Sequence, residues 1–138
     1  MTDMLCEAAK SGTAKRIAQA HVCAAAKTGT VGDQKGNREA LVAGYTTQHT
    51  FVFWYSGNMP NEVNGATAPC SLAANVLAEM YKDGKPQPFT PPLGTTRLTV
   101  DVNSLYNDQL VKLSDTGESF WFDSANTPTT RLVSLDPR

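Results

Sequence analysis

The sequence predicts an α+β protein: helices pack against an antiparallel sheet, and a small β extension follows at the C-terminus. Three observations favour this class. Two apolar, β-branched and aromatic runs stand close together near residues 40–57, a run with helical spacing follows them, and a proline-rich segment then leads to alternating apolar and polar residues. The 138 residues are 41% hydrophobic and 18% charged, which suits a folded chain with a buried core.

The first segment, residues 2–12, predicts a short helix. Thr2 or Asp3 is placed to cap its start and Gly12 to end it. Its apolar residues fall on one face, namely Met4, Leu5 and Ala8. Residues 13–25 leave two readings open, because their alanines permit a helix while the last of them could enter a strand.

The next segments predict three adjacent antiparallel strands near residues 22–32, 40–47 and 50–57. The second and third are joined through Thr47-Gln48-His49, and both are almost continuously apolar. Strands of this kind are usually covered on both faces. We therefore expect the aromatic residues of the third strand to lie in the core, namely Phe51, Phe53 and Trp54.

Residues 67–82 predict the clearest helix, packed on one face of that sheet. Thr67 is placed to cap it, Pro69 suits its first turn, and Asp83-Gly84 would end it. Four apolar residues at helical spacing predict its core stripe, namely Leu72, Val76, Leu77 and Met80.

The composition changes after this helix, and we expect a division into residues 1–83 and 84–138. Residues 85–94 hold four prolines in ten positions, typical of a stiff extended connector. Beyond it, residues 97–102, 109–115 and 118–122 predict a small β unit, in which Phe120-Trp121-Phe122 cover their own core. The last residues, from Ser124, predict a ragged end.

Charge and cysteine content exclude several classes of function. The net charge of -1 gives no reason to expect nucleic acid as a partner. No apolar run has the length of a membrane span, and the N-terminus lacks the basic start of a signal peptide. Cys6, Cys23 and Cys70 cannot all pair and stand in no metal-binding spacing, so we expect no cofactor or metal and read the thiols as small apolar side chains.

The stretch most suggestive of chemistry is Lys27-Thr28-Gly29-Thr30. It is not a phosphate loop, because the glycines that such a loop needs before Lys-Thr are absent. On a strand, by contrast, Lys27 supplies positive charge, Thr28 and Thr30 offer hydroxyls to a carboxylate, and Gly29 lets a peptide approach. The backbone N–H of Thr30 is available to a developing oxyanion. The alternative without a functional role is that Lys27 is a solvated loop lysine.

Lys-Thr-Gly is a motif of serine β-lactamases and penicillin-binding proteins, and the flanking sequence resembles the transpeptidase domain of class A, bifunctional penicillin-binding proteins. Across residues 2–81 the resemblance rests on four further segments in order: Gly12-Thr13-Ala14, Gly44-Tyr45-Thr46, Trp54 within "FVFWYSG", and Gly65-x-Thr67-Ala68 before Pro69. It implies a partial β-lactamase/transpeptidase-like fold. The hairpin and the C-terminal extension fit a β-lactamase less well.

The resemblance also implies an activity: acyl transfer at a serine during peptidoglycan synthesis in the cell wall, with a stem peptide or a β-lactam as the ligand. Lys27 would serve the catalytic electrostatics, and Thr28, Gly29 and Thr30 would bind the substrate. The parent protein would be membrane-anchored and face the extracytoplasmic space, although this chain shows no signal or anchor of its own. No cofactor is implied.

This sequence departs from the family's pattern in its missing nucleophile. No serine has a lysine three residues later, Ala26 stands where a glycine is common, and Pro69 comes one residue early. Ser56-Gly57-Asn58 and Ser124-Ala125-Asn126 have the letters of the family's second motif but follow Lys27 instead of preceding it, so we read both as turns.

The chain then looks like the C-terminal part of the domain, inactive alone, and its uncovered sheet predicts low stability or self-association. The alternative is a non-catalytic module that binds a peptide, glycan or protein.

Overall fold

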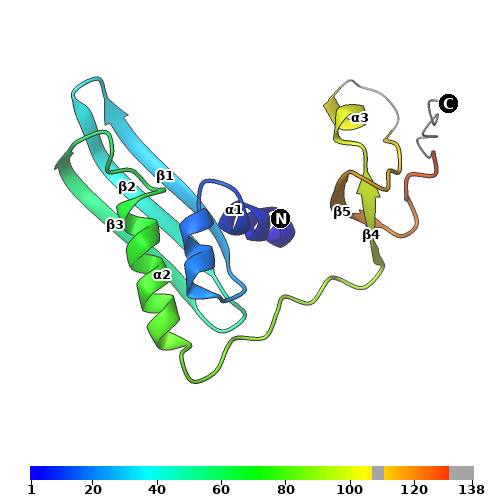
Figure 1. Ribbon diagram of the computed structural model, residues 1–138, viewed down its shortest axis with the longest axis horizontal. Coiled ribbons are helices and arrows are strands. Elements are labelled where there is room, and N and C mark those ends of the chain that lie inside the picture. Colours follow the sequence, from blue (N-terminus) through cyan, green and yellow to red (C-terminus); the bar gives the residue numbers. More distant parts are fainter. Residues whose placement is uncertain (107–110, 131–138) are drawn as a thin grey trace. The chain divides into compact units, whose positions relative to one another are not determined.

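The computed structural model describes residues 1–106 and 111–130, and its backbone forms two compact units, Met1–Phe89 and Thr90–Arg138 (Figure 1). The N-terminal unit contains α1 (Thr2–Lys10), the 3₁₀ helix η1 (Lys15–Ala20), β1 (Ala25–Asp33), β2 (Gly36–Tyr45), β3 (Thr50–Met59) and α2 (Ala68–Met80). The C-terminal unit contains β4 (Thr95–Val100), α3 (Val102–Tyr106) and β5 (Glu118–Asp123). The predicted α+β class with antiparallel sheets is confirmed.

The N-terminal unit is built on a three-stranded antiparallel sheet in the order β1-β2-β3, as the sequence predicted. Residues that face each other across neighbouring strands point to the same side of a sheet. Thr28, Val42 and Phe53 form one such row. The next row, Gly29, Leu41 and Trp54, points to the opposite side. The register therefore gives the sheet two different faces.

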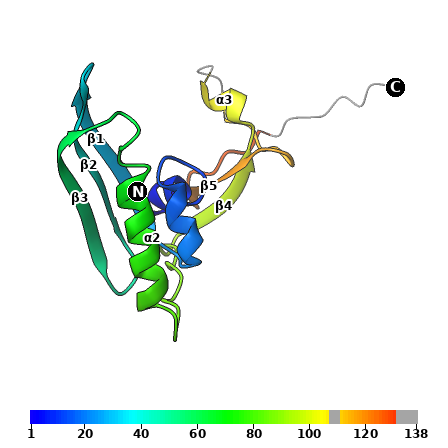
Figure 2. The same cartoon turned by 60° about the vertical axis from the view of Figure 1, so that its left-hand side comes forward.

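The helices cover one of these faces, which we call the inner face, and Figure 2 shows α2 lying along that side of the sheet. The core between them is small and rich in alanine. Its largest fully buried members are Ile17, Val42 and Leu77, each at most 1% exposed, and Tyr81 joins them at 5%. Phe51 and Phe53 pack against it from β3. Because alanine has a short side chain, α2 lies close both to η1 and to the strands β2 and β3, and the core fills with few large residues.

The outer face is apolar and largely open within the described residues, which corrects the expectation that both faces are covered. Val31 is 56% exposed, Val52 63% and Trp54 61%, so Trp54 is not a core residue. The near-continuous apolarity of β2 and β3 had favoured two covered faces. The described helices of this unit supply cover for the inner one alone (Figure 2).

Several helix signals were also wrong in detail. The Thr2 hydroxyl does not cap α1 but hydrogen-bonds the Tyr45 hydroxyl at 2.8 Å. Asp3 lies within that helix, whose last residue, Lys10, is followed by Ser11 and not Gly12 as the cap. Thr67 stands at the N-cap position of α2 without a capping bond, because its hydroxyl donates to loop carbonyls that precede it.

The core stripe of α2 was wrong in part. Pro69 does lie in the first turn, but Leu72 is 40% exposed and Met80 50%, and the helix ends before Tyr81. The buried face consists of Pro69, Cys70, Ala73, Ala74 and Leu77. Small residues face the sheet here because only they allow the helix to lie so close. A prediction from the helical spacing of apolar residues takes no account of side-chain size, and so it chose the larger residues.

The C-terminal unit contains a two-stranded antiparallel ribbon of β4 and β5. The predicted strand at residues 109–115 is reduced to an isolated bridge at Leu113 opposite Val100, and residues 109–110 lie outside the described part. The helix α3 was not predicted. Phe120, Trp121 and Phe122 are half-buried, and the Arg97 guanidinium lies 5.9 Å from the Trp121 ring. The expected ragged end falls partly on residues 131–138, outside the described residues.

Candidate functional site

The Lys-Thr-Gly motif lies in the middle of β1, an edge strand of the N-terminal sheet. β1 pairs with β2 along one side, with Lys27 opposite Ala43 and Thr30 opposite Ala40. Lys27 is exposed and on a strand, so the loop reading is wrong. An edge strand presents unpaired backbone groups, and an extended peptide is able to pair with them.

The side chains of the motif alternate between the two faces of the sheet. Lys27 and Gly29 belong to outer-face rows, while Thr28 and Thr30 belong to inner-face rows. The Lys27 Nζ donates a hydrogen bond to the Thr28 carbonyl oxygen at 3.0 Å. The four side chains therefore do not converge on one point, and they meet a ligand only along the edge that both faces share.

The inner-face residues of the motif are held by two segments distant in sequence. The Thr28 hydroxyl donates to the Thr13 hydroxyl at 2.9 Å, and the Gly65 backbone N–H donates to the Thr30 hydroxyl at 3.0 Å. Thr13 lies between α1 and η1, and Gly65 precedes α2. The structure thus brings both flanking segments onto the motif strand.

At Gly65 the backbone of the loop before α2 lies directly against the backbone of β1 and β2. A Cβ at this position would lie 2.5 Å from the Gly29 carbonyl oxygen and 2.6 Å from the Leu41 carbonyl oxygen. Only glycine permits this approach to β1 and β2. By contrast, a Cβ on Gly29 would meet the Leu41 side chain at 3.1 Å, so that side chain occupies part of the space above the motif glycine.

The loop that carries Gly65 is braced by Asn37 of β2. The Asn37 Nδ2 donates to the carbonyl oxygens of Asn61 and Val63, at 3.0 Å each. Sequence reasoning singled out neither Asn37 nor the individual roles of Thr13 and Gly65. For the last two a signal existed, because both belong to short glycine-containing segments in a fixed order around the motif.

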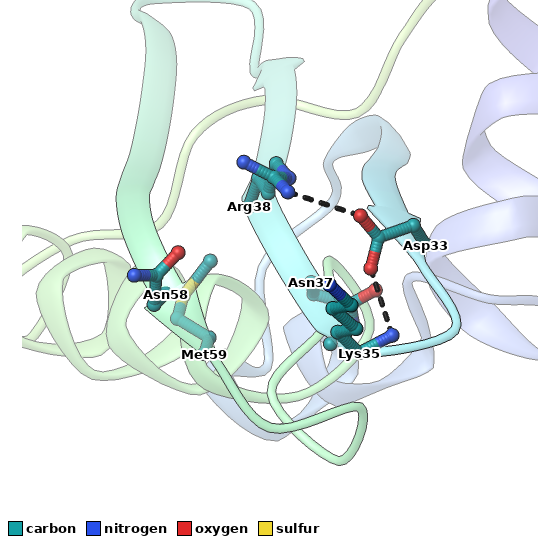
Figure 3. A pocket seen from close by; sticks show the side chains of 7 residues that line it. Asp33, Lys35, Asn37, Arg38, Asn58 and Met59 are labelled. Carbon is teal, nitrogen blue, oxygen red and sulfur yellow. Dashed lines mark hydrogen bonds and ion pairs between the residues drawn. The ribbon is translucent and has the colours of Figure 1, made fainter.

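One cavity of the described structure lies at the β1–β2 turn, and Lys27 does not line it (Figure 3). It measures about 360 Å³ and is lined by Asp33, Lys35, Gly36, Asn37, Arg38, Asn58 and Met59. Hydrogen bonding by the Lys35 N–H, and then by Arg38 at 3.0 Å, lowers the pKa of Asp33 below its usual value. Asp33 stands six residues beyond Lys27, about 20 Å along an extended strand. The exposed polar turn explains the cavity without a ligand.

The two Ser-x-Asn tripeptides fall in different settings. Ser124-Ala125-Asn126 forms a turn, in which the Asp123 carboxylate accepts the Ala125 N–H at 3.0 Å. Ser56-Gly57-Asn58 lies within β3 and not in a turn, which corrects that reading. Gly57, at φ 144°, takes the positive φ that a side chain would resist, so the strand continues past the predicted turn.

The described residues offer neither a metal-binding cluster nor a membrane-spanning helix. They contain no group of three or more histidine, cysteine, aspartate or glutamate side chains placed to hold a metal ion. None of their helices combines the length and apolarity needed to cross a bilayer.

Comparison with known proteins points in one direction. No family model matches the chain. The chain is similar to penicillin-binding protein 1A of Clostridium perfringens, at 26% identity over 133 residues. That match includes 92% of this chain, and so most of the C-terminal unit, but 16% of the longer protein. The chain therefore spans a small part of the length of this relative, to which it is distantly similar.

Proposed function

We propose that this chain supplies the Lys-Thr-Gly strand of a peptidoglycan D,D-transpeptidase domain of the penicillin-binding protein class. One observation carries the proposal: the motif lies on an exposed edge strand to which both flanking segments, through Thr13 and Gly65, are hydrogen-bonded. The similarity to penicillin-binding protein 1A supports it independently. Residues 1–83 would belong to the transpeptidase domain, and residues 84–138 would form a connector and a β extension.

The ligand would be the D-Ala-D-Ala end of a stem peptide, or a β-lactam, laid along the free edge of β1. Lys27 would attract the terminal carboxylate and set the charge of the site. The Thr30 hydroxyl accepts from Gly65, so its own O–H is available to donate to that carboxylate. The Thr28 O–H already donates to Thr13 and would have to turn away from it to bind an anion. Thr30 is thus the better-placed hydroxyl.

The chemical step would be acyl transfer through a serine. That serine would lie outside these 138 residues, because none of their serines stands in Ser-x-x-Lys. The Thr30 N–H would donate to the oxyanion of the acylation step together with the nucleophile's own amide. The parent protein would be anchored in the membrane and work on the extracytoplasmic side.

Labelled penicillin tests this proposal. The 138-residue chain alone is expected to take up no label by intact mass, whereas the longest in-frame product that contains it should be acylated on a serine in Ser-x-x-Lys. In that product Lys27→Ala should slow acylation by about 10²-fold or more, since it removes the fixed charge beside the reacting group. Lys35→Ala, on the turn at the end of the same strand, is the matched control and should change the rate little. An in-frame product without Ser-x-x-Lys and without label contradicts the proposal.

A second candidate function, a non-catalytic binding module, is favoured by the outer face alone. Val52 and Trp54 are more than half exposed there, beside the half-buried Leu41 and Ala43. Exposed apolar surface of this kind is typical of an interface. A module of this class would bind its partner without Lys27.

The same face predicts self-association of the 138-residue chain. Sedimentation velocity over a range of concentrations should show dimers or larger species, because pairing two outer faces removes Trp54 from water. Trp54→Ser should weaken association at least about tenfold. Leu72→Ser, an exposed leucine on α2, is the control. A monomer whose melting temperature does not depend on concentration would contradict this prediction.

A further inference from the structure

Two of the three thiols, Cys6 and Cys23, lie beside each other although they are distant in sequence. Cys6 is on α1, and Cys23 stands just before β1. Both line the same cavity of about 220 Å³, and the Cys23 thiol is near enough to contribute to the raised pKa of Cys6. The cavity is otherwise lined mainly by small or aliphatic residues, among them Ala9, Ala18, Val22 and Ala24. Two thiols from distant parts of the chain thus border one open space.

The third cysteine has a different setting. Cys70 is fully buried on α2, in the alanine-rich core, and is not among the residues that line this cavity. The odd cysteine count therefore divides into a neighbouring pair and one isolated core thiol. This division could not be read from the sequence, where three cysteines permit three different pairings.

We infer that Cys6 and Cys23 form a redox-active pair, which closes to a disulfide by exchange with a disulfide oxidant. The link would tie α1 to the entry of β1, four residues before Lys27. It would hold the start of the motif strand against the first helix. This inference does not rest on the proposed function, because it uses only the cavity that both thiols line and their exposure.

The exposures of the two thiols set the order of the reaction. Cys23 is exposed and Cys6 half-buried. Burial, followed by the neighbouring Cys23 thiol and the acidic residues Asp3 and Glu7, raises the pKa of Cys6 to about 11. Because the thiolate is the nucleophile, Cys23 reacts first with a small-molecule disulfide.

The exchange proceeds in two balanced steps. The Cys23 thiolate attacks one sulfur of the oxidant, forms a mixed disulfide and releases one thiolate of the reagent. Cys6 then loses its proton to solvent, attacks the Cys23 Sγ and releases the second reagent thiolate. Two protein thiols are oxidised and one reagent disulfide is reduced to two thiols. Once Cys23 is in the mixed disulfide, it no longer raises the pKa of Cys6 by its charge, which favours the second step.

The experiment oxidises the 138-residue chain with oxidised glutathione and maps the product by mass spectrometry without reduction. The expected product lacks two hydrogens and yields a cross-linked peptide that joins Cys6 to Cys23, with Cys70 free. In Cys6→Ser the mixed disulfide with glutathione should accumulate on Cys23, and Cys70→Ala, the matched control, should still form the link. Oxidation of wild type should raise the melting temperature of the N-terminal unit by roughly 10 °C, and Cys6→Ser should show no such rise.

Each other outcome overturns the inference. A wild-type chain that keeps glutathione on Cys23 without an internal link would show that the two thiols cannot reach bonding geometry. A link between two chains through Cys23 would show that Cys23 is only an exposed thiol. Because the map of the wild-type chain gives this answer by itself, the test does not depend on the folding of any variant.

Discussion

Gly65→Ala is expected to lower the free energy of unfolding of the N-terminal unit by about 3 kcal/mol, because overpacking against rigid groups costs about this much. The added methyl group would meet the carbonyl oxygens of Gly29 and Leu41, at 2.5 and 2.6 Å. Both oxygens belong to paired strands, so neither moves without disturbing the pairing of β1 with β2. The loop before α2 must then lift off the motif strand, which also costs the bond from the Gly65 N–H to Thr30.

Urea unfolding measures this effect as a lower midpoint with an unchanged slope. Gly84→Ala is the matched control: it lies after α2, and a Cβ there would find nothing within 4 Å. That variant should unfold at the wild-type midpoint or slightly above it, since alanine restricts the unfolded chain. Equal midpoints for Gly65→Ala and Gly84→Ala would show that the loop does not rest on the motif strand as the structure has it.

The sequence predicted the elements of the N-terminal unit because local signals there agree with the fold. β-branched and aromatic runs marked β2 and β3, and Pro69 marked the start of α2. Which face of a strand or helix is buried was predicted less well. Trp54 and Leu72 are apolar by type but exposed, because what covers a residue depends on elements far away in sequence. In the C-terminal unit the signals were weaker, and α3 was missed.

The candidate site shows the same division. The position of Lys27 on a strand was predicted from the pattern of its segment together with the family resemblance, because the segment alone also permitted a loop. The contacts that hold the motif, from Thr13 to Thr28 and from Gly65 to Thr30, join segments 15 and 35 residues apart. The spacing of residues along the sequence does not by itself predict such contacts between distant segments. The pairing of Cys6 with Cys23 was missed for the same reason, since an odd cysteine count alone does not choose a pair.

Leu77→Ala is expected to lower the free energy of unfolding by about 4 kcal/mol, near the upper end of the ~2–5 kcal/mol that buried leucines lose on truncation. Leu77 is 1% exposed and is among the largest side chains of the core. The size of the loss depends on how far the neighbours collapse into the cavity left behind. Here most of the surrounding cluster is alanine, namely Ala9, Ala14, Ala20, Ala24, Ala26 and Ala73. Because alanine has no rotamers with which to fill space, the cavity should stay open.

Leu72→Ala separates burial from every other effect of the same substitution. Leu72 lies on the same helix, is 40% exposed, and gains the same helix propensity on mutation. Its loss should be below about 1 kcal/mol, since Leu72 is already partly in water and its truncation leaves no enclosed cavity. The difference between the two variants, measured by urea unfolding, therefore reports the packing of α2 on the sheet. Equal losses would mean that α2 does not present Leu77 to the strands. The packing of α2 on the inner face, which supports the Lys27 strand, would then differ from that in the structure.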